Sequence, residues 1–156
     1  MFGQNASPQE HFRLILITVV GGAFGAAGYL LEERPPQWAG GQYRFHTDLG
    51  NGLNGFIEFM HLYYAEGKPS RFRVTLTRTD QLVPNLASTH PRFVHRSLAE
   101  LVVEDFGVAI LPSADHWWTY ENGDTRALGL ALGEAGSLMV GYGIPYLAGN
   151  LEPPNR

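Results

Sequence analysis

One uncharged stretch near the N terminus constrains this chain more than any other feature. Residues Leu14–Leu31 read LILITVVGGAFGAAGYLL, a run of apolar and small residues without a single charge. As a helix this run would be about 27 Å long, close to the roughly 30 Å hydrocarbon core of a bilayer. Arg13 precedes it, and Glu32–Arg34 followed by two prolines end it. The pattern predicts one transmembrane helix at residues 13–34.

The same stretch predicts a surface for packing against another helix. Its small residues recur three or four positions apart, and in a membrane such a surface lets a second helix approach closely. We therefore expect contacts with other membrane protein subunits along this side of the helix. The predicted helix-packing residues are Gly21, Gly22, Gly25, Ala26 and Gly28.

Two alternative interpretations of this stretch lead to other functions. LILITVV could be a buried strand, with Gly22, Gly25 and Gly28 in a phosphate-binding loop and Asp48, about 20 residues further on, as a ribose ligand. That interpretation predicts a small soluble nucleotide-binding domain or enzyme. The stretch could instead be a secretory signal cleaved after Gly28, which would leave an exported binding module.

Composition limits the classes of partner and chemistry. The chain has 156 residues, enough for one domain of about 120 residues beside the predicted anchor. A net charge of −4 argues against a nucleic-acid surface, which needs clustered lysine and arginine. The absence of cysteine excludes disulfides, cysteine nucleophiles and thiolate metal sites. Charged residues make up only 17% of the chain, below the usual quarter, as expected of a domain that is buried against partners.

The rest of the chain predicts an α+β domain with an antiparallel sheet and two helices. Phe56, Ile57 and Met60 are spaced as on one face of a helix at residues 53–66. Ser97 and Glu100 form a capping-box pattern that starts a second helix, which runs to Asp105. The expected strands are residues 43–47, 71–79, 108–111, 117–120 and 125–132, the last two joined as a hairpin by Asn122-Gly123, with a turn at 133–137 and an edge strand at 138–147.

The predicted domain boundaries follow from these elements. An N-terminal tail (1–12) precedes the transmembrane helix (13–34), a linker (35–42) leads into the globular domain (43–149), and a C-terminal tail (150–156) ends the chain. Glu58 and His61 lie three residues apart on the first predicted helix of the domain, where we expect both side chains to face solvent.

Aromatic and basic residues outside the apolar stretch predict protein contacts. Tryptophan is enriched at interface hot spots, and arginine beside histidine makes a basic patch that could meet an acidic partner or lipid headgroups. The predicted interface residues are Trp38, Trp117, Trp118, Arg92 and Arg96. The candidate metal ligands are His90, His95 and His116, but their spacing defines no complete site, so we predict no metal and no cofactor.

Together these features predict a non-catalytic, single-pass membrane-anchored accessory or assembly subunit of a larger membrane protein complex. Its α+β domain would make protein–protein contacts at the membrane surface. The expected partners are other membrane protein subunits and the lipid bilayer, and no nucleic acid. The charges that flank the stretch favour an N terminus in the cytoplasm and an extracytoplasmic domain.

Overall fold

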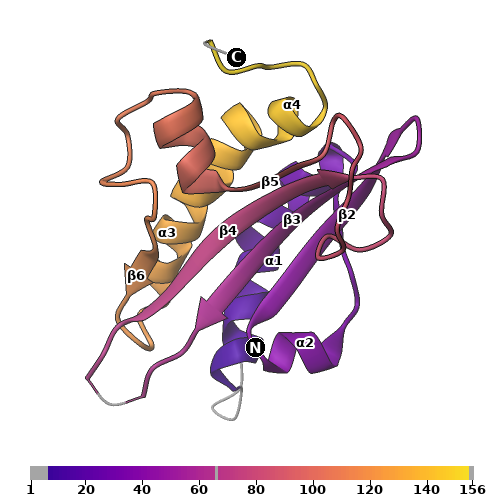
Figure 1. Ribbon diagram of the computed structural model, residues 1–156. Helices are drawn as coiled ribbons and strands as arrows, with labels where there is room; N and C mark the ends of the chain where they lie inside the picture. Colours follow the sequence, from indigo (N-terminus) through magenta and orange to yellow (C-terminus); the bar gives the residue numbers. More distant parts are fainter. Residues whose placement is uncertain (1–6, 66, 155–156) are drawn as a thin grey trace.

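The computed structural model describes residues 7–65 and 67–154 and has an α+β fold (Figure 1). An antiparallel sheet carries two long helices on one face, which confirms the predicted fold class. The strands are β1 (Leu30–Leu31), β2 (Gln42–Gly50), β3 (Leu53–Leu62), β4 (Ser70–Thr79), β5 (Val94–Ser97) and β6 (Trp118–Tyr120). The α-helices are α1 (Pro8–Ala26), α2 (Pro35–Ala39), α3 (Thr125–Leu138) and α4 (Ile144–Leu147), and the π-helical segments are η1 (Glu100–Asp105) and η2 (Met139–Gly143).

The sheet is a meander whose last long strand has two short neighbours. The strand order is β1-β2-β3-β4-β5, and β6 also pairs with β4. β5 pairs with one end of β4 and β6 with the other, so the two short strands share the outer edge of β4. Directly paired residues of an antiparallel ladder lie on the same face. The register therefore places these residues on the helix-covered face: Tyr43, Phe45, Ile57, Phe59, His61, Phe72, Val74 and Leu76.

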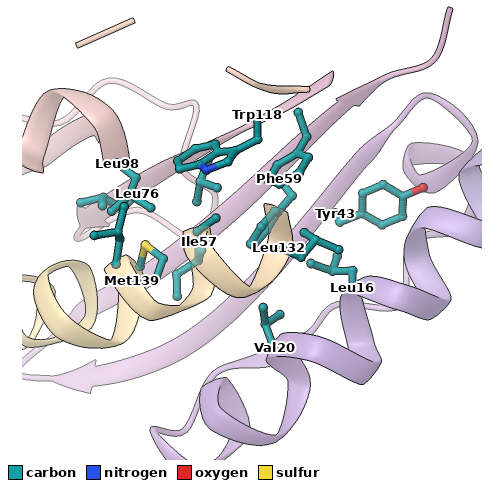
Figure 2. Close-up of a cluster of buried hydrophobic side chains, with 14 of the residues drawn as sticks. Leu16, Val20, Tyr43, Ile57, Phe59, Leu76, Leu98, Trp118, Leu132 and Met139 are labelled. Carbon is teal, nitrogen blue, oxygen red and sulfur yellow. The ribbon is translucent and has the colours of Figure 1, made fainter. Parts of the chain in front are cut away.

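The core lies between this face and the two long helices (Figure 2). α1 contributes a buried residue at every fourth position, and α3 with η2 contributes a second buried stripe at helical spacing. In Figure 2, Leu16 and Val20 from α1 and Leu132 and Met139 from the second helix point toward the strands. The two stripes are Phe12, Leu16, Val20 and Phe24, and Leu128, Leu132, Ala135 and Met139.

The predicted transmembrane helix at residues 13–34 is wrong. α1 ends at Ala26, Tyr29 is buried, and Leu30–Leu31 pair with β2 as a strand. Glu32 then forms an ion pair with Arg44 of β2, with 3.1 Å between its carboxylate and Nε. The apolar run is long because it joins a core helix, a turn of small residues and a strand, so it is not one element.

Residues 53–62 form strand β3 instead of the predicted helix. Asn51 and Gly52 have φ values of 55° and 77°, as required in a tight hairpin between β2 and β3. Ile57 and Phe59 face the helices, whereas Phe56 lies on the opposite face of the sheet and is also fully buried. Burial on both faces produces an apolar spacing that resembles a helical stripe.

The strands predicted at 125–132 and 138–147 are also wrong, because α3, η2 and α4 form one continuous helix, which includes the turn predicted at 133–137. Asn122-Gly123 does not join two strands here. The side chain of Asp124, the next residue, accepts a hydrogen bond from the Ala127 N–H at 2.9 Å and caps α3. Residues 118–120 are the strand β6, but they pair with β4. The strand predicted at 108–111 is a loop with a turn.

Three local predictions are confirmed. The strand predicted at residues 43–47 is part of β2, and the alternating segment at residues 71–79 is part of β4. The capping box also forms: Ser97 Oγ accepts from the Glu100 N–H at 3.0 Å, and the Glu100 carboxylate accepts from the Ser97 N–H at 2.9 Å. The segment after this box is π-helical, and it buries Leu101 and Val102 against the core.

Candidate functional site

The outer surface of the helix layer, away from the sheet, is hollowed between α1 and the second long helix. The hollow has a volume of about 450 Å³. It is lined by Val19, Val20, Ala23, Phe24, Gly133, Gly136, Ser137, Val140 and Gly141. Every one of these side chains is uncharged, and most are small. The hollow therefore offers van der Waals contact and accessible backbone to whatever occupies it.

The hollow exists because the two helices run in the same direction and approach each other closely. His11 near the start of α1 lies 3.0 Å from the Thr125 hydroxyl at the start of α3. Further along, a Cβ added to Gly136 would lie 2.9 Å from Val20 Cγ1. A glycine is therefore required at this crossing, and the small residues on the solvent side leave the space above it unfilled.

Two long uncharged stretches of sequence contribute to the walls of the hollow. The sequence has no charged residue between Arg13 and Glu32, and none between Glu134 and Glu152. Large apolar side chains are exposed on the same helices: Ile17 is 39% exposed, Leu130 67% and Val140 47%. Exposed apolar surface of this kind marks interaction sites in soluble and membrane-associated proteins.

Within the described residues, one helix is long and apolar enough to cross a membrane, Thr125–Leu147. This measure uses length and composition only, and 39% of the helix's most apolar window is buried in the fold. Core helices of soluble proteins satisfy the same measure. The apolar character that the sequence indicates at the N terminus is thus shared by both long helices.

The predicted helix-packing glycines inside α1 make no close contact with another element of this chain. A Cβ added to Gly22 or Gly25 would meet nothing within 4 Å, and Ala26 is exposed. Gly21 faces its own helix, where an added Cβ would lie 3.5 Å from Ile17. A role for this exposed side of α1 in contacts with a partner stays a prediction.

Gly28 ends α1. It has a φ of 91°, and its N–H donates to the Gly25 carbonyl at 2.9 Å. The N–H of Tyr29 donates to the Phe24 carbonyl, also at 2.9 Å. These two bonds form the Schellman motif that closes many helices. Gly22 and Gly25 lie inside α1, so these glycines do not form a loop before a helix, which the phosphate-binding alternative requires.

The three predicted interface tryptophans occupy different environments. Trp118 is 4% exposed and stacks on Phe72 in the core, and its Nε1–H donates to the Glu134 carboxylate at 2.7 Å. Trp38 is half-buried beneath the Arg13 guanidinium at 4.8 Å. Trp117 lies on the helix-free face of the sheet, where two arginines of β4 flank its ring.

The two predicted interface arginines, Arg96 and Arg92, also occupy different environments. Arg96 bridges to η1, with 2.7 Å to Asp105, 3.0 Å to Glu104 and 3.5 Å to Glu100. These carboxylates, Asp105 first, raise the pKa of Arg96. Arg96 therefore holds η1 against β5. Arg92 is exposed, and its backbone carbonyl accepts from Arg78 Nε at 2.7 Å.

The candidate metal ligands lie apart. His90 Nδ1 accepts from the Arg92 N–H at 3.0 Å, His95 Nδ1 lies 2.9 Å from the Thr77 hydroxyl, and His116 packs edge-on against Trp118. Over residues 7–65 and 67–154, no group of three or more histidine or carboxylate side chains is arranged to hold a metal ion.

The predicted solvent exposure of His61 is wrong, because this residue is fully buried on the helix-covered face. Its ring stacks on Phe12 at 4.0 Å, and Nε2 lies 2.6 Å from the Tyr120 hydroxyl. Nδ1 lies 2.8 Å from Gln9 Oε1. Burial lowers the pKa of His61 to about 4. Strand alternation through Ile57 and Phe59 would have predicted this position, whereas helical spacing placed His61 on a polar side.

The hydrogen bonds around the His61 ring form a closed network with Gln9, Tyr43 and Tyr120. The Gln9 amide N–H donates to the His61 carbonyl, so Gln9 Oε1 accepts from the ring Nδ1–H. Nε2 is then the acceptor for the Tyr120 hydroxyl. The Tyr43 hydroxyl also donates to Gln9 Oε1, at 2.8 Å. The arrangement fixes α1 to the sheet and leaves no polar atom of the imidazole free for chemistry.

Comparison with protein families, with curated proteins and with solved structures finds no match to this chain. The geometry of the helix layer's outer surface is therefore the main guide to what the protein binds.

Proposed function

We propose that this chain is a non-catalytic accessory subunit that assembles with a membrane protein by binding one of that partner's apolar helices. The observation that carries the proposal is the uncharged hollow between α1 and the second long helix. Its lining of glycine, alanine, serine and valine resembles the small-residue surfaces that membrane helices use to pack closely.

An apolar helix suits this hollow better than an extended segment does. Two helices that run side by side leave a groove between them, and the side-chain ridge of a third helix fits such a groove. An extended peptide carries unpaired backbone groups, which a surface of apolar side chains cannot satisfy. Charged side chains on a partner would find no opposite charge here, so the occupant should be apolar along the contact.

In this arrangement the domain docks on a membrane protein and has no N-terminal membrane anchor at residues 13–34. α1 is a core helix of the fold, so membrane association would come from the partner and from the exposed apolar surface. The predicted orientation, with the N terminus in the cytoplasm and the domain outside, depended on an N-terminal span. It therefore does not apply to this fold.

Photocrosslinking tests the proposal at single positions. A photoreactive amino acid at Ala23, which is exposed at the rim of the hollow, should crosslink in native membranes to one integral membrane protein, identified by mass spectrometry. The same amino acid at Leu82, an apolar residue that is 85% exposed on a distant loop, should not. Crosslinking from Ala23 only to a second copy of this chain, or only to lipid, would contradict the proposal.

A further inference from the structure

The face of the sheet opposite the helices carries a second, polar hollow. It has a volume of about 240 Å³ and lies over the middle of β3 and β4. Its lining includes Gln42, Glu58, Met60, Arg73, Thr75 and His95. None of these side chains belongs to the apolar hollow described above, so this site is independent of the proposed docking function.

Two opposite charges face this hollow without meeting. The register pairs Glu58 with Thr75, and Met60 with Arg73, so Glu58 and Arg73 are diagonal neighbours on one face of the sheet. In the part of the chain that the structure describes, neither side chain forms an ion pair with the other or with any third residue. The hollow thus contains an open pair of opposite charges.

The guanidinium of Arg73 contacts an aromatic ring. It lies 5.0 Å from the centroid of Trp117, and Arg71 lies 4.2 Å from the same centroid. Both contacts are of the cation–π type. Arg73 is exposed and lines the hollow, and among the described residues its guanidinium forms no hydrogen bond or ion pair, so its donors are available to a ligand.

The arginine paired with Glu58 in the sheet binds a different carboxylate. Arg44 lies directly opposite Glu58 on β2, but its Nε is 3.1 Å from the Glu32 carboxylate. Glu58 is half-buried, and this burial, with the nearby charge of Glu32, raises its pKa against the opposing effects of His95 and Arg34. A partly desolvated carboxylate without a partner gains most from a cationic group that enters the site.

We propose that this hollow binds a small zwitterion, with the ligand's ammonium group on Glu58 and its carboxylate on Arg73. Free α-amino acids belong to this chemical class, and small members of it match the volume of the hollow. Met60 supplies an apolar contact, and Gln42 and Thr75 supply neutral hydrogen-bond partners. A simple anion would be repelled by Glu58, and a simple cation by Arg73 and Arg44.

Titration followed by NMR tests the site directly. The protein labelled with ¹⁵N is titrated with each free amino acid in turn, with ethylammonium as a cation alone and with acetate as an anion alone. At least one amino acid should give saturable shifts for the amides around residues 58, 73, 75 and 95, and the single-charge probes should not saturate over the same range. The substitutions Glu58→Gln and Arg73→Gln should each weaken binding at least tenfold.

Matched controls separate the site from general charge effects. Glu33→Gln and Arg126→Gln remove exposed charges outside the hollow and should leave binding unchanged. A readout on the unaltered protein is the ¹³C resonance of the Glu58 carboxyl, whose apparent pKa should fall when the ammonium group binds beside it. Absence of saturation by every amino acid, equal binding by acetate, or unchanged binding in Glu58→Gln would overturn the proposal.

Discussion

At the scale of single residues, His61 joins three elements that are far apart in the sequence. Its ring touches Phe12 of α1 and Tyr120 of β6, and both nitrogens are hydrogen-bonded inside the protein. A neutral imidazole satisfies this arrangement, because one nitrogen donates and the other accepts. A protonated ring would turn the acceptor into a second donor in a buried site, which is why burial holds the pKa of His61 near 4.

This buried imidazole predicts a specific pH dependence of stability. Between pH 6.5 and 4 the unfolded chain takes up a proton that the folded protein excludes. The free energy of unfolding should therefore fall as the pH falls through this window, with a contribution from His61 that approaches about 1.4 kcal/mol per pH unit. Glu58 acts in the opposite direction, since its raised pKa stabilises the folded protein at lower pH.

Comparison with His61→Asn isolates the contribution of the imidazole, because Glu58 is common to both proteins. Urea unfolding at pH 7, 6 and 5 should show the variant less stable at pH 7, with a gap to the unaltered protein that narrows as the pH falls. A gap that stays constant over this range would show that His61 is not held neutral by the fold.

Two glycines of α3 form a matched pair for testing the helix crossing. A Cβ at Gly136 would lie 2.9 Å from the buried Val20 side chain, whereas a Cβ at Gly133 would meet nothing within 4 Å. Gly136→Ala should lower the free energy of unfolding by about 1–3 kcal/mol through overpacking. Gly133→Ala should raise it by about 0.5–1 kcal/mol through helix propensity. Urea unfolding that showed stabilisation by both substitutions would contradict the close approach of the two helices.

At the scale of elements, the cap of α3 distinguishes the observed helix from the predicted hairpin. The Asp124 side chain accepts from the Ala127 N–H, so Asp124→Ala should lower the free energy of unfolding by about 1 kcal/mol. Asp124→Asn keeps the acceptor and should cost much less. Thermal unfolding of the two variants measures the difference, and equal destabilisation would argue against a capping role.

The sequence predicts elements well where a single mechanism operates. The alternation in 71–79 reflects a strand whose large apolar residues all lie on the helix-covered face, and the Ser97–Glu100 pair forms the expected reciprocal hydrogen bonds. The prediction of secondary structure failed where the same short sequence pattern occurs in different structures. Asn-Gly occurs three times: at Asn51, where it forms a hairpin, at Asn54, inside β3, and at Asn122, where it precedes a helix cap. The first and third of these form turns. The dipeptide alone does not distinguish these cases, because a strand comes after the first turn and a helix after the second.

The candidate site was predictable only in part. The low charge and small residues of the first helix indicate a packing surface around Gly22, Gly25 and Ala26, which stays a prediction, and these residues do not line the hollow. The other wall of the hollow comes from α3 and η2, whose residues looked like two strands. A surface made by segments more than a hundred residues apart requires the tertiary fold, because no local pattern records that Val20 and Gly136 meet.

At the scale of the whole molecule, the two sides have opposite characters. The hollow in the outer surface of the helix layer is lined by uncharged residues, and the free face of the sheet carries arginine, glutamate and histidine around a polar hollow. An apolar partner on one side would leave the polar side accessible. The proposed docking function and the proposed zwitterion site are therefore compatible in one molecule and can be tested separately.

Membrane fractionation of charged variants tests whether the apolar hollow docks on a membrane protein. Arginine introduced together at Ala23 and Ser137, both exposed at the hollow, is compared with arginine introduced together at Leu82 and Leu86, which are 85% and 48% exposed on a distant loop. Urea unfolding first establishes that both double variants are folded.

The quantity measured is the fraction of chain that sediments with native membranes after a high-salt wash. The account predicts that the unaltered protein and the Leu82/Leu86 variant sediment, whereas the folded Ala23/Ser137 variant stays in the supernatant. Sedimentation of the Ala23/Ser137 variant to the same extent as the unaltered protein, or recovery of the unaltered protein wholly in the supernatant, would contradict the account.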